Sequence, residues 1–448
     1  MIPASSNRSR LASAGVLGAL LVLVVVVVAG YVRAYPLLSP VDELQHIDYL
    51  DRATGFGVVR AGDRVREPAM REEACRRVDA HFDMHIPECD EPELDPAEFQ
   101  EQGFNTAYVH PPTYYVVTGT IGRVIDAAPG IASWVTAGRL AGALWLGLAV
   151  VLTWWLFAEL GIAVAIRVPL LVVMICAPAT MLASATITPD VTALAAGAGV
   201  LLAVVLWESK RAHWVWPVLA CGIAIACKST NGIGVLVALG YLGVRSLQSR
   251  RALGAPAPTT GARTTRELVT VGAGILAAAA IVGLAWVGVA RAIQRSDPES
   301  IPMIERSHVD SIGASAVRAN VTAGFTPLKD AYLPDFLEES SAVRTYDEWL
   351  DVVVAVGAVL GIAYAGAWTR LRALGVAAVV VCLAAGTALV VANFVFSGIY
   401  VDIPPRYALS ALPGLLAVCA VPLERRFLLV AASAFAAALT FSTLWSIY

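Results

Sequence analysis

Charged side chains are scarce in this sequence. Only 15% of its 448 residues are Asp, Glu, Lys or Arg, whereas 58% are hydrophobic. A water-soluble protein of this length needs more charge to cover its surface. The hydrophobic residues come in runs of about 20, which is the length of helix that spans a hydrocarbon layer of about 30 Å. The composition excludes a soluble globular protein and predicts an all-α polytopic membrane protein with about 11 transmembrane helices.

Several common functional motifs are also missing. The sequence has no Walker motif and no glycine-rich dinucleotide motif, which argues against an ATP-driven pump. The net charge of −3 gives no reason to expect a nucleic-acid partner. No CxxC or Cys/His spacing indicates a zinc site. The residues by themselves therefore call for no cofactor.

Seven cysteines are present, in two kinds of surroundings. Cys75 and Cys89 lie in a long polar loop that is expected on the outer side, where disulfides persist. A bridge between them and two free thiols both stay open. The other five lie in hydrophobic runs and are expected to be small core residues; they are Cys176, Cys221, Cys227, Cys382 and Cys419.

Basic residues set the expected orientation of the spans. The first hydrophobic run, 12–34, is too long for the core of a signal peptide and is expected to stay as a helix. The other predicted spans are 135–158, 166–186, 190–207, 213–229, 231–246, 268–292, 347–367, 373–396, 407–423 and 427–446. With these spans, the basic residues gather on the cytoplasmic side together with the N-terminus. They are Arg8, Arg10, Arg167, Lys210, Arg211, five arginines within 245–266, Arg370, Arg372, Arg425 and Arg426.

Two loops and one linker organise the chain. The first outer loop, 35–134, belongs to an N-terminal membrane module, 1–246; its first part, 35–110, has 17 acidic residues, 7 arginines and no lysine. Within this loop, 111–127 is predicted to be an amphipathic helix in the membrane interface. A cytoplasmic linker, 247–267, leads to the C-terminal half, 268–448, which carries a second outer loop, 293–346.

An acidic motif follows the first span directly. If a short helix begins near Ser39, then Asp42, Glu43 and His46 share one of its faces. Acids beside a membrane are costly unless they are solvated or used. We therefore expect a function for Asp42 and Glu43, whereas Asp48, Asp51 and the acids within 72–101 are expected to form a solvated face.

Other ionisable residues fall at the outer ends of predicted spans. They are Arg139, Asp190, Lys228 and Arg406. Cations at headgroup depth can hold a phosphate, and a carboxylate can take a proton from an attacking hydroxyl. Each residue also has an ordinary structural interpretation. Asp190 follows Thr188 and Pro189, as at many helix starts, and the cations can extend to lipid headgroups.

Five motifs in order resemble those of the GT-C superfamily of polyprenyl-phosphate-sugar-dependent integral membrane glycosyltransferases. They are Pro40-x-Asp42-Glu43-x-x-His46, His110-Pro-Pro-Thr-Tyr-Tyr, Gly138-Arg139-Leu140-x-Gly-Ala-Leu, Thr188-Pro189-Asp190, and Pro405-Arg406-Tyr407-x-Leu-x-x-Leu-Pro413. The chain looks most like an uncharacterised, actinobacterial-like branch of predicted GT-C-type proteins. It departs from that branch at Arg406, which follows Pro-Pro instead of Gln-Gly. It also lacks the large C-terminal outer domain of oligosaccharyltransferases.

This resemblance implies a multi-pass enzyme of the cell membrane with its active site outside the cytoplasm. The donor would be a polyprenyl-phosphate sugar, and the acceptor a glycan, lipid or protein of the cell envelope. Asp42 would be the base, with Glu43 supporting it or sharing the role, and Asp190 would be the second-loop acid. Substrate-binding candidates are His46, His110, Arg139, Lys228, Arg406 and Tyr407. Some relatives bind a divalent metal, and the three acids leave that possibility open.

Two other functions remain as alternatives. A transporter or flippase of lipid-linked saccharide would place charges in mid-span and break helices in both halves. A non-catalytic subunit of envelope assembly would need no acid pair at the membrane entrance. The sequence does not determine the sugar, the acceptor, the carrier length or the oligomeric state.

Overall fold

The computed structural model describes residues 5–79, 85–252, 263–295, 301–321, 324, 326–328, 332–338, 340–367 and 369–448. Within these residues the chain is helical, and its only β-pairing consists of three isolated bridges. The predicted linker 247–267 and outer loop 293–346 lie partly outside the described residues. The prediction of an all-α fold is confirmed.

Eight helices in the described part of the chain are long and apolar enough to cross a membrane, or nine if one bent pair is counted as a span. The chain is therefore a multi-pass helical membrane protein. The eight are Leu11–Ala34, Trp134–Glu159, Pro189–Glu208, Ser229–Arg250, Thr265–Ile293, Arg370–Val395, Pro405–Glu424 and Arg426–Ile447. Their main helical segments are α1 (Ser5–Ala34), α5 (Trp134–Leu140), α6 (Gly142–Glu159), α9 (Thr192–Glu208), α11 (Gly232–Ala252), α12 (Thr265–Ile293), α17 (Arg370–Ser397), α18 (Leu412–Cys419) and α19 (Arg426–Ile447). Short 3-10 turns precede three of them, namely η4 (Pro189–Val191), η5 (Ser229–Asn231) and η7 (Pro405–Ala411).

The bent pair consists of α7 (Val164–Cys176) and α8 (Pro178–Ala185), which meet at an angle of 59°. Proline has no N–H to continue the helical ladder, and it forces the residue before it out of the helical region. Ala177, directly before Pro178, is accordingly extended, with φ −68° and ψ 135°. The predicted span 166–186 is therefore two helices with a proline break.

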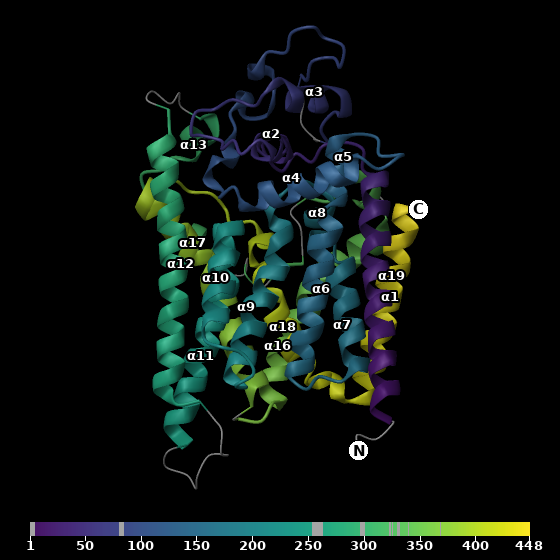
Figure 1. Cartoon of the computed structure of the whole chain (residues 1–448), viewed down its shortest axis with the longest axis vertical. Coiled ribbons are helices and arrows are strands. Elements are labelled where there is room, and N and C mark those ends of the chain that lie inside the picture. Colours follow the sequence, from purple (N-terminus) through teal and green to yellow (C-terminus); the bar gives the residue numbers. More distant parts are fainter. Residues whose placement is uncertain are drawn as a thin grey trace.

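Two further predicted spans correspond to helices that are short or carry several acids. The span 213–229 contains α10 (Val215–Cys227), which has only 13 residues. The span 347–367 corresponds to α16 (Ser341–Tyr364), whose first half carries Asp347 and Asp351, both buried. Neither helix meets the length and charge expected of a lone membrane span, although both lie within the bundle (Figure 1).

The first outer loop forms a helical cap over one end of the bundle (Figure 1). Its helices are α2 (Glu43–Thr54), α3 (Glu67–Arg76) and α4 (Thr113–Asp126), with short 3-10 turns η1 (Pro96–Glu98), η2 (Gln100–Gly103) and η3 (Thr106–Val109). A separate hydrophobic core, which includes the buried Tyr49 and Tyr115, holds the cap together. A disulfide joins Cys75 at the end of α3 to Cys89, with their Cα atoms 4.4 Å apart. Of the two states that the sequence left open, the structure contains the bridged one.

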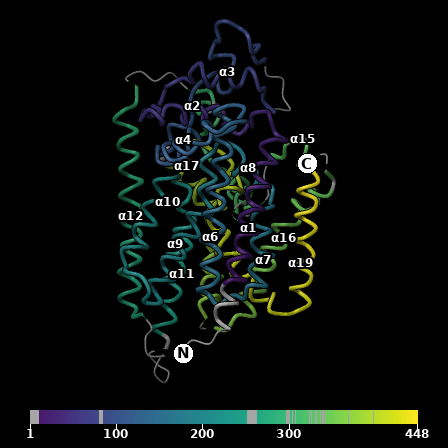
Figure 2. The backbone as a smooth tube through the Cα atoms, turned by 45° about the vertical axis from the view of Figure 1, so that its right-hand side comes forward, coloured from purple at the N-terminus to yellow at the C-terminus, as the bar shows by residue number. Residues whose placement is uncertain are grey.

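The two ends of the described chain lie at opposite ends of the bundle. The first turn of α1 is far from the cap, whereas α19 ends on the cap side in both views (Figures 1 and 2). The helix α4, which was predicted to lie in the interface, has 14 residues and sits among the cap helices.

A close backbone contact positions η7 inside the bundle. A Cβ atom on Gly197 of α9 would lie 1.8 Å from the carbonyl oxygen of Ser410, so only glycine fits there. The hydroxyl of Ser410 also accepts a 3.0 Å hydrogen bond from the backbone N–H of Gly234. Small residues allow such contacts between membrane helices. The start of η7, which carries Arg406 and Tyr407, is thereby held beside α9 and α11.

Two cap acids that were predicted to be solvated are buried. Asp48 accepts hydrogen bonds from Arg52, Arg66 and Asn105, and it organises the cap. Glu73 lies in α3 beside Gln100, whose side-chain amide donates to it at 3.2 Å. Helical spacing turned both side chains inward, which their polarity alone did not indicate.

Replacing Glu73 by Gln should stabilise the protein at neutral and alkaline pH. Burial raises the pKa of Glu73 to about 8, above its usual value of 4.5. The folded state therefore keeps the proton between these values while the unfolded state loses it, so stability falls as pH rises through this window. We expect Glu73→Gln to remove this fall and to add about 4 kcal/mol at pH 8. Thermal melting from pH 4.5 to 9 checks this, and equal pH profiles for both proteins would contradict it.

Candidate functional site

The outer ends of several helices bring one acid and two cations together. Asp190, in η4, accepts a 2.5 Å hydrogen bond from Lys228 Nζ at its Oδ1 atom and a 3.1 Å bond from Arg406 Nε at its Oδ2 atom. These residues come from the ends of three different spans, and all three side chains are largely buried. The group carries a net charge of +1 at the cap end of the bundle.

Local sequence explains the position of Asp190. The hydroxyl of Thr188 accepts a hydrogen bond from the backbone N–H of Asp190 at 3.3 Å, and Pro189 occupies the first helical position. This is the ordinary helix start that the sequence allowed. The structure adds that both carboxylate oxygens are bound to cations. Asp190 therefore holds Lys228 and Arg406 in place.

Tyr407 supports the same two cations. Lys228 Nζ lies 4.5 Å from the centre of the Tyr407 ring, and the Arg406 guanidinium carbon lies 5.7 Å from it. The negative face of an aromatic ring attracts such cations. Three of the predicted substrate-binding residues, Lys228, Arg406 and Tyr407, are thus brought together around Asp190.

Asp42 lies beside this cluster with a free carboxylate. It precedes α2 in a left-handed backbone conformation, with φ 58° and ψ 14°. The helix therefore begins at Glu43, four residues after the start near Ser39 that the sequence predicted. Within the described part of the chain, the Asp42 carboxylate makes no hydrogen bond or ion pair. A left-handed residue other than glycine often marks a functional position.

The surroundings of Asp42 favour its protonated form. Burial raises the pKa of Asp42, while Arg406 and Lys228 oppose this effect and Glu101 adds to it. Glu101 is a site residue that sequence analysis missed. It also has a left-handed backbone, with φ 52°, next to Gln102. In the sequence nothing distinguishes Glu101 from the many other acids of the loop.

Glu43 and Arg139 form a buried clamp. Arg139 donates to the Glu43 carboxylate through Nε at 2.9 Å and Nη2 at 2.7 Å, and the side chains are 0% and 1% exposed. The backbone N–H groups of Ser39 and Ile187 donate to the same carboxylate at 2.8 and 2.9 Å. Arg139 also donates to two backbone carbonyls at the end of the first span. The structure thus pairs the two residues with each other in the interior, and their catalytic and phosphate-binding roles stay predictions.

His46 and His110 lie together under the cap, with ring centres 5.5 Å apart. His46 Nδ1 is 2.8 Å from the hydroxyl of Tyr115, a partner within the HPPTYY motif that sequence analysis did not select. Burial lowers the pKa of both imidazoles, that of His110 to about 3. Both rings are therefore neutral near pH 7. His110 Nδ1 is buried without a hydrogen-bond partner among the described residues.

The acids do not form a metal site of the usual kind. Among the described residues, no group of three or more His, Cys, Asp or Glu side chains is arranged to hold a metal ion. The sequence allowed Asp42, Glu43 and Asp190 to share a metal. Glu43 is instead bound to Arg139, and Asp190 is bound to Lys228 and Arg406. These side chains do not fit a metal, and no reaction step is assigned to one.

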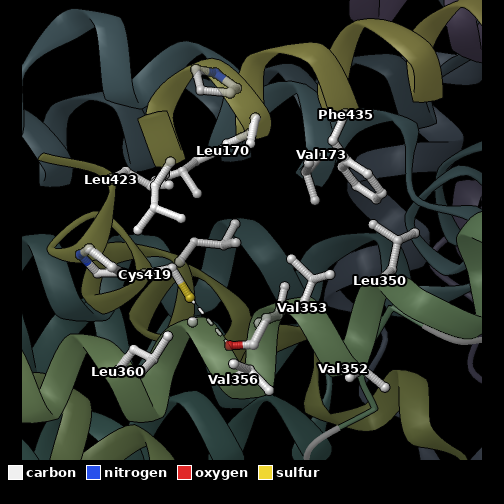
Figure 3. Close-up of a pocket in the computed structure, with 18 of the residues that line it drawn as sticks. Leu170, Val173, Leu350, Val352, Val353, Val356, Leu360, Cys419, Leu423 and Phe435 are labelled. Carbon is white, nitrogen blue, oxygen red and sulfur yellow. Dashed lines mark hydrogen bonds between the residues drawn. The ribbon is translucent and has the colours of Figure 1, made fainter. Parts of the chain in front are cut away.

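A cavity of about 510 Å³ lies within the membrane-spanning layer, away from these residues. It is bordered by α7, α16, α18 and α19, and aliphatic and aromatic side chains such as Leu170, Val353 and Phe435 point into it (Figure 3). None of its lining residues is ionisable except the thiol of Cys419, which bonds the Val354 carbonyl. This cavity suits an apolar chain and offers no group for acid–base chemistry.

Comparison with known proteins does not identify a family. No protein-family model matches the chain, and no curated protein matches it.

Proposed function

We propose that this protein is an integral membrane glycosyltransferase that moves a sugar from a polyprenyl-phosphate donor to a cell-envelope glycan, lipid or protein. The observation that carries this proposal is the unpaired carboxylate of Asp42 beside the net-positive group of Asp190, Lys228 and Arg406. A general base next to an anion-binding group, at the depth of lipid headgroups, suits a reaction of a phosphorylated lipid.

The charges match those of the donor. A sugar joined to a lipid through one phosphate is a diester with a single negative charge, and the cation cluster carries +1. Lys228 and Arg406 would hold the phosphate, and they would stabilise the charge that develops on it as the sugar–oxygen bond breaks. The ion pairs with Asp190 fix the positions of both cations before the substrate binds, which lowers the cost of ordering them.

The reaction is a single displacement. The acceptor hydroxyl oxygen attacks the anomeric carbon, its proton passes to Asp42, and the bond from that carbon to the lipid phosphate breaks. The lipid phosphate leaves with the electron pair, and the sugar is inverted at that carbon. The neutral His46 and His110 supply hydrogen-bonding nitrogens to sugar hydroxyls without adding charge.

The topology behind this proposal has eleven crossings. These are the eight long apolar helices, the bent pair α7–α8, and the two helices α10 and α16. The chain ends lie at opposite ends of the bundle, which agrees with an odd number such as eleven. Basic residues such as Arg167 and Arg425 lie at the ends of helices away from the cap. That end is then cytoplasmic, and the cap and the site lie on the outer face of the cell membrane.

One observation bears on the alternative of a flippase. The break at Pro178 interrupts one helix in the first half of the chain, as in many transporters. The charged residues near the site, however, lie at helix ends and not in mid-span. The transferase therefore remains the better explanation.

The purified protein in lipid nanodiscs should bind a radiolabelled polyprenyl-phosphate sugar and release its label from the lipid. We expect Lys228→Gln to weaken donor binding by about tenfold, because one phosphate contact is lost. Lys210→Gln is the matched control, since Lys210 is exposed beyond the far end of α9. The measurement is a donor titration followed by lipid extraction. Failure of the wild type to bind any donor of the panel would overturn the proposal.

A further inference from the structure

A second pocket opens on the outer surface of the cap, at the C-terminal end of α2. Its volume is about 470 Å³. Polar and small residues line it, namely Asp51, Arg52, Gly55, Gly57, Val58, Arg60, Asp63, Arg66 and Arg123. Four arginines and two aspartates leave the lining with a net charge of +2. A concave surface with this excess favours an anionic ligand.

Two of the four arginines are already held by carboxylates. Arg52 donates to Asp48 at 2.8 Å and to Asp63 at 3.2 Å. Arg66 contacts Asp48 at 3.3 Å and Asp51 at 2.6 Å. These pairs fix the walls of the pocket. They leave the other two arginines to account for its excess positive charge.

Those two are Arg60 and Arg123. The side chain of Arg60 is 57% exposed, and its Nε atom lies 4.0 Å from the nearest Asp63 oxygen. Arg123, which is exposed on α4, donates to the hydroxyl of Thr54 and has no carboxylate partner in the described part of the chain. Both guanidinium groups therefore keep donors for a carboxylate or phosphate, which arginine binds well because its fork matches two oxygens.

An exposed aromatic residue lies next in sequence to the pocket lining. Phe56 lies between the lining residues Gly55 and Gly57, and it is 87% exposed. Its backbone is left-handed, with φ 59°, which is rare for a bulky residue. A turn alone would be better served by Gly or Asn. A phenyl ring that is kept in water, next in sequence to two lining residues, presents an apolar face to a ligand that has both apolar and charged parts.

We propose that this pocket binds an acidic sugar unit of the acceptor glycan, with its carboxylate on Arg60 and Arg123 and its ring against Phe56. The identification as an acceptor rests on the proposed transferase function. Helix α2 sets the distance between the two sites, since Asp42 precedes its first turn and the pocket lies at its last turn. Helix α2 has twelve residues and is about 18 Å long. A ligand that reached both sites would therefore be an oligosaccharide and not a single sugar.

Binding is tested with the full chain in nanodiscs of zwitterionic lipid. The probes are a galacturonic acid tetrasaccharide, its carboxyl-reduced neutral counterpart, and inorganic phosphate. We expect the acidic saccharide to bind at least about tenfold more tightly than the neutral one. The double variant Arg60→Gln/Arg123→Gln should remove this preference. Asn suits a left-handed backbone, so Phe56→Asn should weaken the binding of both saccharides and leave the melting temperature unchanged. Arg318→Gln, at an exposed position of α14 (Ala314–Ala319), is the control and should bind like wild type.

Three results would overturn the proposal. They are no binding of the acidic saccharide by wild type, equal binding of the acidic and neutral forms, and unchanged binding in the double variant. Inorganic phosphate that binds equally tightly, with no effect of Phe56→Asn, would show a simple anion site and would also overturn it. Acidic saccharide binding by a wild type that neither binds nor turns over any donor would instead overturn the transferase function alone.

Discussion

Replacing Asp42 by Asn is expected to lower the rate of sugar transfer by about 10² to 10⁴-fold, which is the usual contribution of a general base. Donor affinity should persist, because Asp190, Lys228 and Arg406 keep their mutual contacts. Folding should persist as well. The Asp42 carboxylate bonds no described residue, and Asn tolerates a left-handed backbone. Asp126→Asn, at the exposed end of α4, is the matched control.

The pH profile gives an independent check on the same residue. Because the pKa of Asp42 is raised, its basic form is present only above that pKa, and kcat/KM should fall on the acid side at a pH above the ordinary value of about 4. Glu101 contributes to this rise, so Glu101→Gln should move the acid limb to lower pH. Transfer by Asp42→Asn at the wild-type rate, or an acid limb that Glu101→Gln leaves in place, would exclude Asp42 as the base.

Replacing Arg139 by Gln is expected to destabilise the protein by about 3–5 kcal/mol, because it leaves the buried Glu43 carboxylate without its cation. The same change removes donors to two backbone carbonyls of the first outer loop. Thermal melting in detergent measures the loss, and low yield of folded protein is the expected outcome at 37 °C. Arg123→Gln, an exposed arginine of the cap, should cost far less.

A double-mutant cycle separates the ion pair from the rest of the clamp. Glu43→Gln alone leaves Arg139 buried and charged, whereas the double variant Glu43→Gln/Arg139→Gln removes both charges. The double variant should therefore be less destabilised than the sum of the single variants, by at least about 1 kcal/mol. If Arg139→Gln melts like wild type and weakens donor binding instead, Arg139 returns to the phosphate site that the sequence predicted.

The membrane-spanning class was readable from sequence because lipid imposes a strong and simple constraint. Long runs of apolar residues specify spans almost without regard to tertiary contacts. The bend at Pro178 and the short α10 were harder to foresee, because the hydrophobic pattern continues through them. Helix type was predictable there, and helix geometry was not.

The site was only partly readable, for a different reason. The sequence located Asp42, Glu43 and Asp190 at one membrane edge, but it did not show which carboxylates are already paired. Pairing depends on contacts between residues far apart in the chain, such as the 216 positions between Asp190 and Arg406. Burial of Asp48 and Glu73 was missed because the acidic loop looked uniformly polar, although a helix in it turns some acids inward.

The Glu43 clamp can form only after a long stretch of the chain has been synthesised. The carboxylate of Glu43 has its hydrogen-bond partners only after Arg139, 96 positions later, and Ile187, 144 positions later, have been made. Asp190 gains Lys228 38 residues later and Arg406 216 residues later. A nascent chain therefore carries uncompensated acids until these partners have been made. The group of Asp190, Lys228 and Arg406 is complete only once Arg406 has been added, so a chain that stops before Arg406 would lack it.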